Sequence, residues 1–270
     1  MPAHEHNRRA WDARARDGAR FARPASDEEI ARPGDLTDAA GWLGDVRGKR
    51  LLCLAAGGGK HGPLYAAAGA DVTVVDLSGE MLALDRQVAA EKRLTLRTVE
   101  ASMDDLSALA DAAFDVVCQP VSTCYVPDVV AVFREVARVL AAGGLYLSQH
   151  KQPGSLQAGD RPSPLGYELV EPYYRSGPLP EVAGSLHREH GTLEYLHRWE
   201  ELIGGMCRSG FVVEDLIEPR HAKSDAATDS FAHRSRYVAP YVRIKARRTN
   251  AASPSAGCLP PGRSPLWSPD

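Results

Sequence analysis

Apolar residues between positions 50 and 150 follow two alternating patterns, and each predicts a different kind of element. Short apolar runs read as buried strands, and longer stretches with apolar positions three and four apart read as helices. The predicted strands cover residues 50–56, 71–77, 94–102, 114–121 and 145–150. The predicted helices cover residues 61–70, 79–92 and 127–140. Strands that alternate with helices in this way form right-handed βαβ units, so we expect an α/β fold with a doubly wound, mostly parallel sheet.

The rest of the chain departs from this rhythm. Residues 1–45 are polar and broken by Pro and Gly, and they predict an N-terminal cap whose helix, Asn7–Arg20, starts at Asn7. Residues 151–192 are rich in proline and tyrosine, which is typical of a lid or binding insertion.

The C-terminal part completes the predicted sheet. A helix is predicted over residues 192–209, and strands over 211–217 and 241–248, which gives seven strands in all. The Pro/Ser-rich residues 249–270 predict a disordered tail. The main domain therefore spans residues 46–248.

Composition excludes several classes of protein. The chain has 270 residues, a formal net charge of -3 and 44% hydrophobic residues, which fits one globular domain and gives no reason to expect nucleic-acid binding. No apolar run is long enough for a membrane helix, and the start has no apolar signal region. The five scattered cysteines contain no CxxC pair, which indicates a reducing compartment without a zinc site. We therefore expect a cytoplasmic enzyme.

The strongest chemical signal is the segment AAGGGKHG, which joins the first strand to the first helix. Small residues there allow the backbone to approach a ligand closely, and the helix N-terminus favours an anionic group. Asp76 ends the next strand, 19 positions after Gly57, where a carboxylate binds both hydroxyls of a ribose. Loop and carboxylate together predict a nucleoside-containing ligand. A tight turn with Asp76 as a helix cap is the structural alternative.

The order of the segments LLCLAAGGGKHG, VTVVDLS, VEASMDDL, AFDVVCQPV and FREVARVLAAGGLYLSQ resembles the class I S-adenosylmethionine-dependent methyltransferases, in particular their small-molecule group. The resemblance implies a Rossmann-like fold, S-adenosylmethionine as cofactor, and methyl transfer to a small-molecule acceptor by in-line displacement. It assigns cofactor-binding roles to nine positions, namely Ala55, Ala56, Gly57, Gly59, Asp76, Leu77, Ser102, Met103 and Gln119. Cys53 and Ser102 stand where the family usually has acidic residues.

Residues near the carboxyl ends of the predicted strands are candidates for the reaction and for the acceptor. His150 ends the fifth strand and His197 starts the helical pattern after the insertion, so either is a candidate base. Tyr125, Tyr173 and Tyr174 are candidate walls of a substrate pocket, although packing within a lid explains them equally well.

Three other functions remain open on the sequence. An RNA or protein methyltransferase would use the basic run between residues 219 and 248, which we otherwise expect to be the solvated face of an edge strand. A NAD(P)-dependent oxidoreductase would use the same glycine loop for a dinucleotide. A paralogue that binds the cofactor but is inactive is also compatible with Cys53 and Ser102. HREH at residues 187–190 has metal-ligand spacing, but no further ligand completes the pattern, so we expect no metal.

Overall fold

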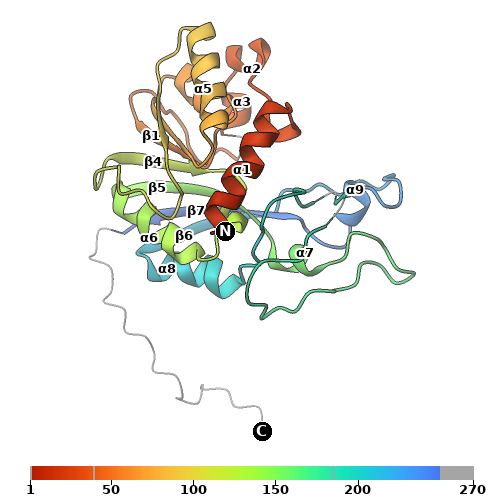
Figure 1. Ribbon diagram of the computed structural model, residues 1–270. Helices are drawn as coiled ribbons and strands as arrows, with labels where there is room; N and C mark the ends of the chain where they lie inside the picture. Colours follow the sequence, from red (N-terminus) through yellow and green to blue (C-terminus); the bar gives the residue numbers. More distant parts are fainter. Residues whose placement is uncertain (1, 39, 183, 186, 250–270) are drawn as a thin grey trace, which may run out of the picture.

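The computed structural model describes residues 2–38, 40–182, 184–185 and 187–249. Within these residues, seven strands form one sheet in the order β3-β2-β1-β4-β5-β7-β6 (Figure 1). The strands are β1 (Arg50–Leu54), β2 (Asp71–Asp76), β3 (Arg97–Glu100), β4 (Phe114–Gln119), β5 (Leu140–Lys151), β6 (Phe211–Ile217) and β7 (Tyr241–Arg248). Strands β1 to β5 pair in parallel, whereas β7 is antiparallel to both of its neighbours. The predicted mostly parallel, seven-stranded sheet is confirmed.

Helices cover both faces of the sheet, which explains why its central strands are apolar throughout. The helices between the parallel strands are α4 (His61–Ala67), α5 (Gly79–Lys92) and α6 (Val129–Val139). Leu52 and Leu54 of β1 belong to a core cluster with Phe133 of α6. Leu51 and Cys53, which alternate with them, belong to a second cluster with α4. The period of two along β1 therefore divides the core into two layers.

Side-chain caps set the helix ends in this region. Helix α5 has the predicted bounds, and the hydroxyl of Ser78 accepts a hydrogen bond from the backbone N–H of Met81. Helix α6 is shorter than predicted because the Asp128 carboxylate accepts hydrogen bonds from the backbone N–H groups of Val130 and Ala131.

The predicted N-terminal helix is correct in kind and wrong in its start. Helix α1 spans Ala3–Arg16, so Asn7 lies inside the helix and is not its cap. Asn7 is buried, and its side-chain amide donates hydrogen bonds to the carbonyls of Tyr125 and Leu193 at 2.9 and 3.0 Å. It also accepts one from the Leu193 N–H at 2.8 Å. These distant partners satisfy Asn7, and no property of the local sequence could show them.

The helix predicted over residues 192–209 is also only partly present. A π-helix, η3 (Glu200–Gly204), and a short α-helix, α8 (Gly205–Arg208), form its second half. Residues 192–198 have no regular secondary structure. Their backbone groups bond elsewhere, as in the 2.7 Å hydrogen bond from the Tyr195 N–H to the Cys124 carbonyl. Tertiary partners therefore override the helical pattern.

The basic C-terminal strand is not the predicted edge strand. Strand β7 lies between β5 and β6, and β6 forms the edge of the sheet. Lys245 and Arg247 both pair with Glu214 of β6, and Arg243 donates a hydrogen bond to Gln149 of β5 at 2.7 Å. These cations join neighbouring strands.

Two segments beyond the sheet fold together into a lobe, which we define as residues 152–198 and 218–240. The lobe contains α7 (Pro153–Gln157) and α9 (Phe231–Arg234), which lie together at one side of the sheet (Figure 1). Arg234 of α9 is almost fully buried and donates hydrogen bonds to the carbonyls of Ser155 and Ala158 at the end of α7. The predicted insertion, residues 151–192, covers only the first of these segments.

Two further expectations concern the ends and the surroundings of the chain. Residues 250–270 of the predicted tail lie outside the described residues. Across the ranges that the structure describes, we find no helix with the length and apolar character needed to cross a bilayer.

A matched pair of glycine substitutions tests the close packing of α4 on the sheet. A Cβ at Gly62 would lie 2.5 Å from Cγ2 of Val74, whereas a Cβ at Gly154 of α7 would meet nothing within 4 Å. We expect Gly62→Ala to lower the free energy of unfolding by about 1–3 kcal/mol because of this overpacking. Gly154→Ala should leave it unchanged or raise it slightly. Urea unfolding followed by circular dichroism measures both, and equal effects would contradict the packing assignment.

Candidate functional site

A cavity of about 810 Å³ opens at the carboxyl edge of the parallel strands. One side, which we call the strand-end half, is formed by the loops that follow β1, β2, β3 and β4. The opposite side, which we call the lobe half, is formed by α1, by the short helix η2 (Thr123–Tyr125) and by the lobe. Eight predicted site residues line this cavity, namely Ala55, Ala56, Gly57, Asp76, Leu77, Ser102, Met103 and Tyr125. The structure therefore brings together most of the predicted cofactor positions.

Asp76 and the glycine loop are tied to each other. The Asp76 carboxylate accepts a hydrogen bond from the Gly57 N–H through Oδ2 and one from the Ser78 N–H through Oδ1, both at 2.9 Å. Burial raises the pKa of Asp76, and these backbone N–H groups oppose that rise. A Cβ at Gly57 would lie 2.8 Å from Cβ of Met81, so this position has no room for a side chain.

Ala55 and Gly59 have backbone conformations that set the course of the glycine loop. Ala55 has a φ of +48°, a left-handed conformation that glycine adopts more easily than alanine. Gly59 does not line the cavity; with a φ of +75°, it packs where a Cβ would lie 3.0 Å from the Leu84 carbonyl oxygen of α5. Gly59 therefore brings loop and helix together.

Asp85 of α5 is a buried acid that binds the glycine loop on the side facing the core. Its Oδ2 accepts a hydrogen bond from the Gly58 N–H at 2.9 Å, while Oδ1 has no hydrogen-bond partner among the described residues. Burial raises the pKa of Asp85 to about 7. Asp85 lies three residues from both Leu82 and Val88, so its spacing places it on the buried face of α5. That spacing is the signal that could have found it.

The residues after β3 and β4 divide between the cavity wall and the core. Ser102 donates a hydrogen bond to Asp104, whose carboxylate also lies 2.9 Å from Nε2 of His4 in α1. Gln119 is buried and does not line the cavity. Its side-chain amide donates hydrogen bonds to the Ser122 hydroxyl at 2.9 Å and to Sδ of Met103 at 3.2 Å. Gln119 thus supports the wall from behind.

Neither predicted base reaches the cavity wall. His150 is almost fully buried, with Nδ1 2.8 Å from the Thr123 hydroxyl and Nε2 2.8 Å from the Ser148 hydroxyl. Burial lowers its pKa to about 3, so the ring stays neutral. His197 is buried, and its Nε2 lies 3.0 Å from the carbonyls of Thr123 and Val126. Both rings hold η2 in place, and the geometry does not support a catalytic role for either.

The predicted tyrosines separate in the same way. Tyr125 lines the cavity, where its ring packs edge-on against Trp11 of α1 at a centroid distance of 5.4 Å. Tyr173 and Tyr174 pack on each other in the lobe, away from the cavity lining, and Tyr174 is 79% exposed. The guanidinium of Arg198 lies over the Tyr174 ring. These two residues pack within the lobe, as the structural alternative proposed.

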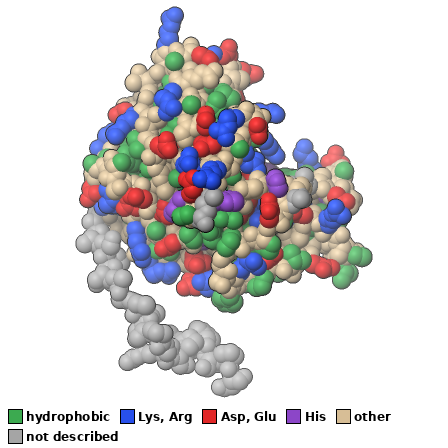
Figure 2. Space-filling model, viewed as in Figure 1, with side chains coloured by type: hydrophobic (Ala, Val, Ile, Leu, Met, Phe, Trp, Pro, Cys, Tyr) green, Lys and Arg blue, Asp and Glu red, His purple; other side chains and the backbone are tan. Residues whose placement is uncertain are grey.

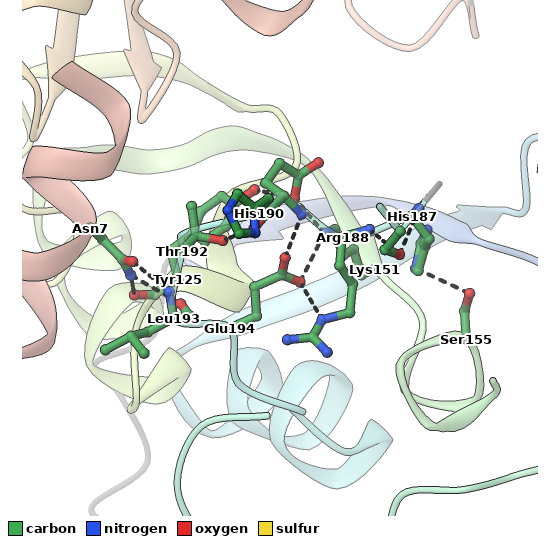
Figure 3. Close-up of polar contacts among 12 residues, drawn as sticks. Asn7, Tyr125, Lys151, Ser155, His187, Arg188, His190, Thr192, Leu193 and Glu194 are labelled. Carbon is green, nitrogen blue, oxygen red and sulfur yellow. Dashed lines mark hydrogen bonds and ion pairs between the residues drawn. The ribbon is translucent and has the colours of Figure 1, made fainter. Parts of the chain in front are cut away.

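The lobe half also contains residues that sequence reasoning missed. Glu189, His221, Phe231 and Tyr241 line the cavity together with Trp11. Glu189 lies within HREH, but residues 187–190 are not helical. Instead, Nε2 of His187 lies 3.1 Å from the Ser155 hydroxyl, and these contacts are drawn in Figure 3. Nothing local marks Phe231 or Tyr241, because the lobe assembles from distant segments.

Comparisons with known proteins assign this chain to a family. The model of the methyltransferase domain matches residues 52–148. The uncharacterized methyltransferase YbaJ of Bacillus subtilis is 34% identical over 242 residues, which cover 84% of this chain and 94% of that relative. The chain belongs to the class I S-adenosylmethionine-dependent methyltransferases.

Solved structures agree on the fold. An S-adenosylmethionine-dependent methyltransferase from Mesorhizobium loti superposes with a TM-score of 0.62 at 23% identity, covering 81% of this chain and all of that one. Geranyl diphosphate C-methyltransferase from Streptomyces coelicolor gives 0.61 at 20% identity, covering 92% and 98% of the two chains. Family membership favours methyl transfer over the NAD(P)-dependent alternative.

The residues of this methyltransferase fit its nucleoside donor. The strand-end half combines one carboxylate, from Asp76, with backbone that carries little or no side chain at Ala55–Gly57 and with apolar surface from Leu77 and Met103. Cys53, at the usual acidic position, is fully buried in the core and does not line the cavity. The site therefore has the carboxylate after β2 and lacks the one in β1.

The buried Asp85 predicts a pH dependence of this methyltransferase's stability. Its folded pKa of about 7 lies above the ordinary value of 3.8, so between about pH 4 and pH 7 the folded state retains a proton that the unfolded state has lost. The free energy of unfolding should therefore fall as the pH rises through that range, by at most about 1.4 kcal/mol per pH unit from this group.

Asp85→Asn keeps an oxygen for the Gly58 N–H and removes the ionisation, so its unfolding free energy should depend less steeply on pH. Urea unfolding between pH 5 and pH 8 measures the difference from the wild type. The exposed Asp225 provides the control substitution Asp225→Asn. An unchanged pH slope in Asp85→Asn would refute the assignment.

Proposed function

We propose that this methyltransferase transfers a methyl group from S-adenosylmethionine to a small-molecule acceptor. The observation that carries the proposal is the single cavity in which the strand-end half faces an aromatic lobe half. Helix α1 and the lobe cover this cavity, so the acceptor must be small enough to enter it. The Streptomyces coelicolor enzyme, named for its acceptor geranyl diphosphate, provides a small-molecule precedent on the same fold.

Each half of the cavity has a proposed role. Asp76 accepts hydrogen bonds from the ribose hydroxyls, and Leu77 and Met103 flank the adenine ring. Ser102 lies at the position of the adenine amino group, with Asp104 behind it as the charged partner. The backbone of Ala55–Gly57 lies along the methionine part of the donor. The lobe half holds the acceptor against Tyr125.

The bound donor supplies an activated methyl group on a sulfonium ion, so the protein's own task is alignment and exclusion of water. Trp11 and Tyr125 provide fixed aromatic surfaces, because Asn7 ties α1 to η2 through the hydrogen bonds in Figure 3. His150 and His197 also contact η2, His150 through the Thr123 hydroxyl and His197 through the Thr123 carbonyl.

The macromolecular alternative has little support from the basic residues. The cations of β7 pair with Glu214 and Gln149 across the sheet. On the face shown in Figure 2, Lys and Arg side chains are interspersed with Asp and Glu. A phosphate backbone would need a continuous positive surface, so a small acceptor fits better.

Titration calorimetry tests the cofactor assignment directly. We expect S-adenosylhomocysteine to bind with micromolar affinity and NAD and NADP to show no binding. Binding of a nicotinamide cofactor, or of none of the three, would overturn the proposal. The second outcome would indicate that the cofactor site has been lost at Cys53 and Ser102. Transfer of a labelled methyl group to extracted small molecules, and not to RNA or protein, then tests the acceptor class.

Two arginines are well placed for the carboxylate of the donor's methionine part. Arg20 and Arg23 line the cavity beside the glycine loop and have no ion pair among the described residues. Their segment packs directly on that loop, with a 2.9 Å hydrogen bond from the Ala25 N–H to the Gly59 carbonyl.

We expect Arg23→Ala to weaken binding of S-adenosylhomocysteine about tenfold, the size of a charge-assisted hydrogen bond. Methylthioadenosine, which lacks the carboxylate, should bind the variant and the wild type equally. Arg16→Ala is the matched control, because Arg16 pairs with Glu80 and does not line the cavity. Equal losses for both ligands would contradict a carboxylate contact.

A further inference from the structure

The lobe half contains a buried network of charges centred on Lys151, the last residue of β5. The Lys151 side chain is 1% exposed, and its ammonium donates hydrogen bonds to Oε2 of Glu189 at 2.7 Å and Oε2 of Glu194 at 2.9 Å. The hydroxyl of Tyr125 donates to the same oxygen of Glu189 at 2.6 Å. Figure 3 shows how Tyr125, Lys151, Arg188 and Glu194 converge there. Apart from the ring of Tyr125, the proposed steps of methyl transfer make no use of this network.

The two carboxylates of the network differ in what they face. Glu194 is fully buried, does not line the cavity and uses its second oxygen to accept the Glu189 N–H. Glu189 lines the cavity with 11% of its side chain exposed, and both of its side-chain hydrogen bonds go to Oε2. Its Oε1 is therefore the carboxylate oxygen available to an occupant of the cavity.

Glu189 is negatively charged at neutral pH. Burial acts to raise its pKa, but the charge of Lys151 and the hydrogen bonds from Lys151 and Tyr125 outweigh burial and lower it. The carboxylate is thus a fixed hydrogen-bond acceptor and a weak base.

Aromatic rings line the same cavity as this carboxylate. Trp11 and Tyr125 pack at a centroid distance of 5.4 Å, and His221 lies 5.4 Å from both Phe231 and Tyr241. Ring faces bind apolar rings by stacking and bind cations through their quadrupole. A carboxylate among aromatic faces therefore favours an occupant that is partly apolar and carries a nitrogen.

The cations near the lobe half already have protein partners. Arg14 donates to the His190 carbonyl at 2.7 Å, and its guanidinium lies over the Trp11 ring. Arg188 donates to the Pro180 carbonyl at 2.8 Å, and its Nε lies 3.7 Å from Glu194. Arg14 and Arg188 are therefore used by the protein itself. Arg20 and Arg23, which line the same cavity, are assigned above to the carboxylate of the donor. Glu189 is then the charged group offered to the acceptor.

We propose that the acceptor is a small amine with an apolar, ring-containing body, and that its N–H group donates a hydrogen bond to Oε1 of Glu189. This inference rests on the proposed methyl transfer and names its substrate class. The neutral amine attacks with its lone pair: the N–C bond forms, the S–C bond breaks, and the electron pair of that bond remains on sulfur. Positive charge moves to the nitrogen, where the carboxylate of Glu189 stabilises it, and the N–H proton then leaves to water. A hydroxyl acceptor would instead need a stronger base than Glu189.

Binding to the protein saturated with S-adenosylhomocysteine tests the inference. The probes are 2-phenylethylamine, 2-phenylethanol and phenylacetate, which share a ring and differ in the polar group. We expect the amine to bind at least tenfold more tightly than either of the others. Equal or tighter binding of the alcohol or the acid, or binding of none of the three, would overturn the amine assignment.

Variants of the two carboxylates separate recognition from structure. Glu189→Gln should weaken binding of the amine at least tenfold and leave binding of S-adenosylhomocysteine within twofold of the wild type. Glu189→Asp keeps the charge, so this variant should retain part of the affinity for the amine. Glu194→Gln disturbs the same Lys151 network without facing the cavity, so any loss of amine binding should be much smaller. Glu168→Gln, at an exposed position of the lobe that does not line the cavity, should have no effect.

An equal loss of amine binding in the Glu189→Gln and Glu194→Gln variants would show a structural effect and refute the inference. Failure of S-adenosylhomocysteine to bind the wild type would instead refute the proposed function. The two failures are therefore distinguishable within one set of titrations.

Discussion

The burial of one ammonium group, that of Lys151, constrains the lobe half of the cavity at the carboxyl edge of this sheet. Burial by itself would lower the pKa of Lys151, but the negative groups around it raise it above its ordinary value. A buried charge without partners would cost several kcal/mol, so Glu189 and Glu194 must lie against the end of β5. The lobe segment that carries them therefore becomes one wall of the cavity, and it is the wall to which we assign the acceptor.

The donor side depends on a second constraint, the close approach of the glycine loop to the sheet and to α5. Asp76 and Asp85 each accept a hydrogen bond from the loop backbone, one at the cavity and one in the core. Gly57 and Gly62 have no room for a Cβ. Only small residues fit between these contacts, and the loop is thereby held ready for a ligand.

Helix α1 connects the two sides. Its Asn7 bonds to the backbone of Tyr125 in η2 and of Leu193 in the lobe. Asp12 lies 2.6 Å from the Ser78 hydroxyl at the start of α5. Trp11 between them lines the cavity. Helix α1 thus contacts the donor side, η2 and the lobe, so a ligand in either half of the cavity lies close to the same helix.

The sequence by itself determined the sheet, its two core layers and most of the donor side. Periodicity and turn residues are local signals, and parallel strands bring the ends of β1 and β2 to one edge, so Gly57 and Asp76 were predictable. The tertiary structure alone decided the acceptor side. Glu189 lies there because it pairs with the buried Lys151, and Arg234 joins the two segments of the lobe through the Ser155 carbonyl. Such distant partners leave no trace in local spacing. For the same reason His150 and His197, well placed in the sequence, turned inward to hold η2, because buried hydroxyls and carbonyls were there to pair with them.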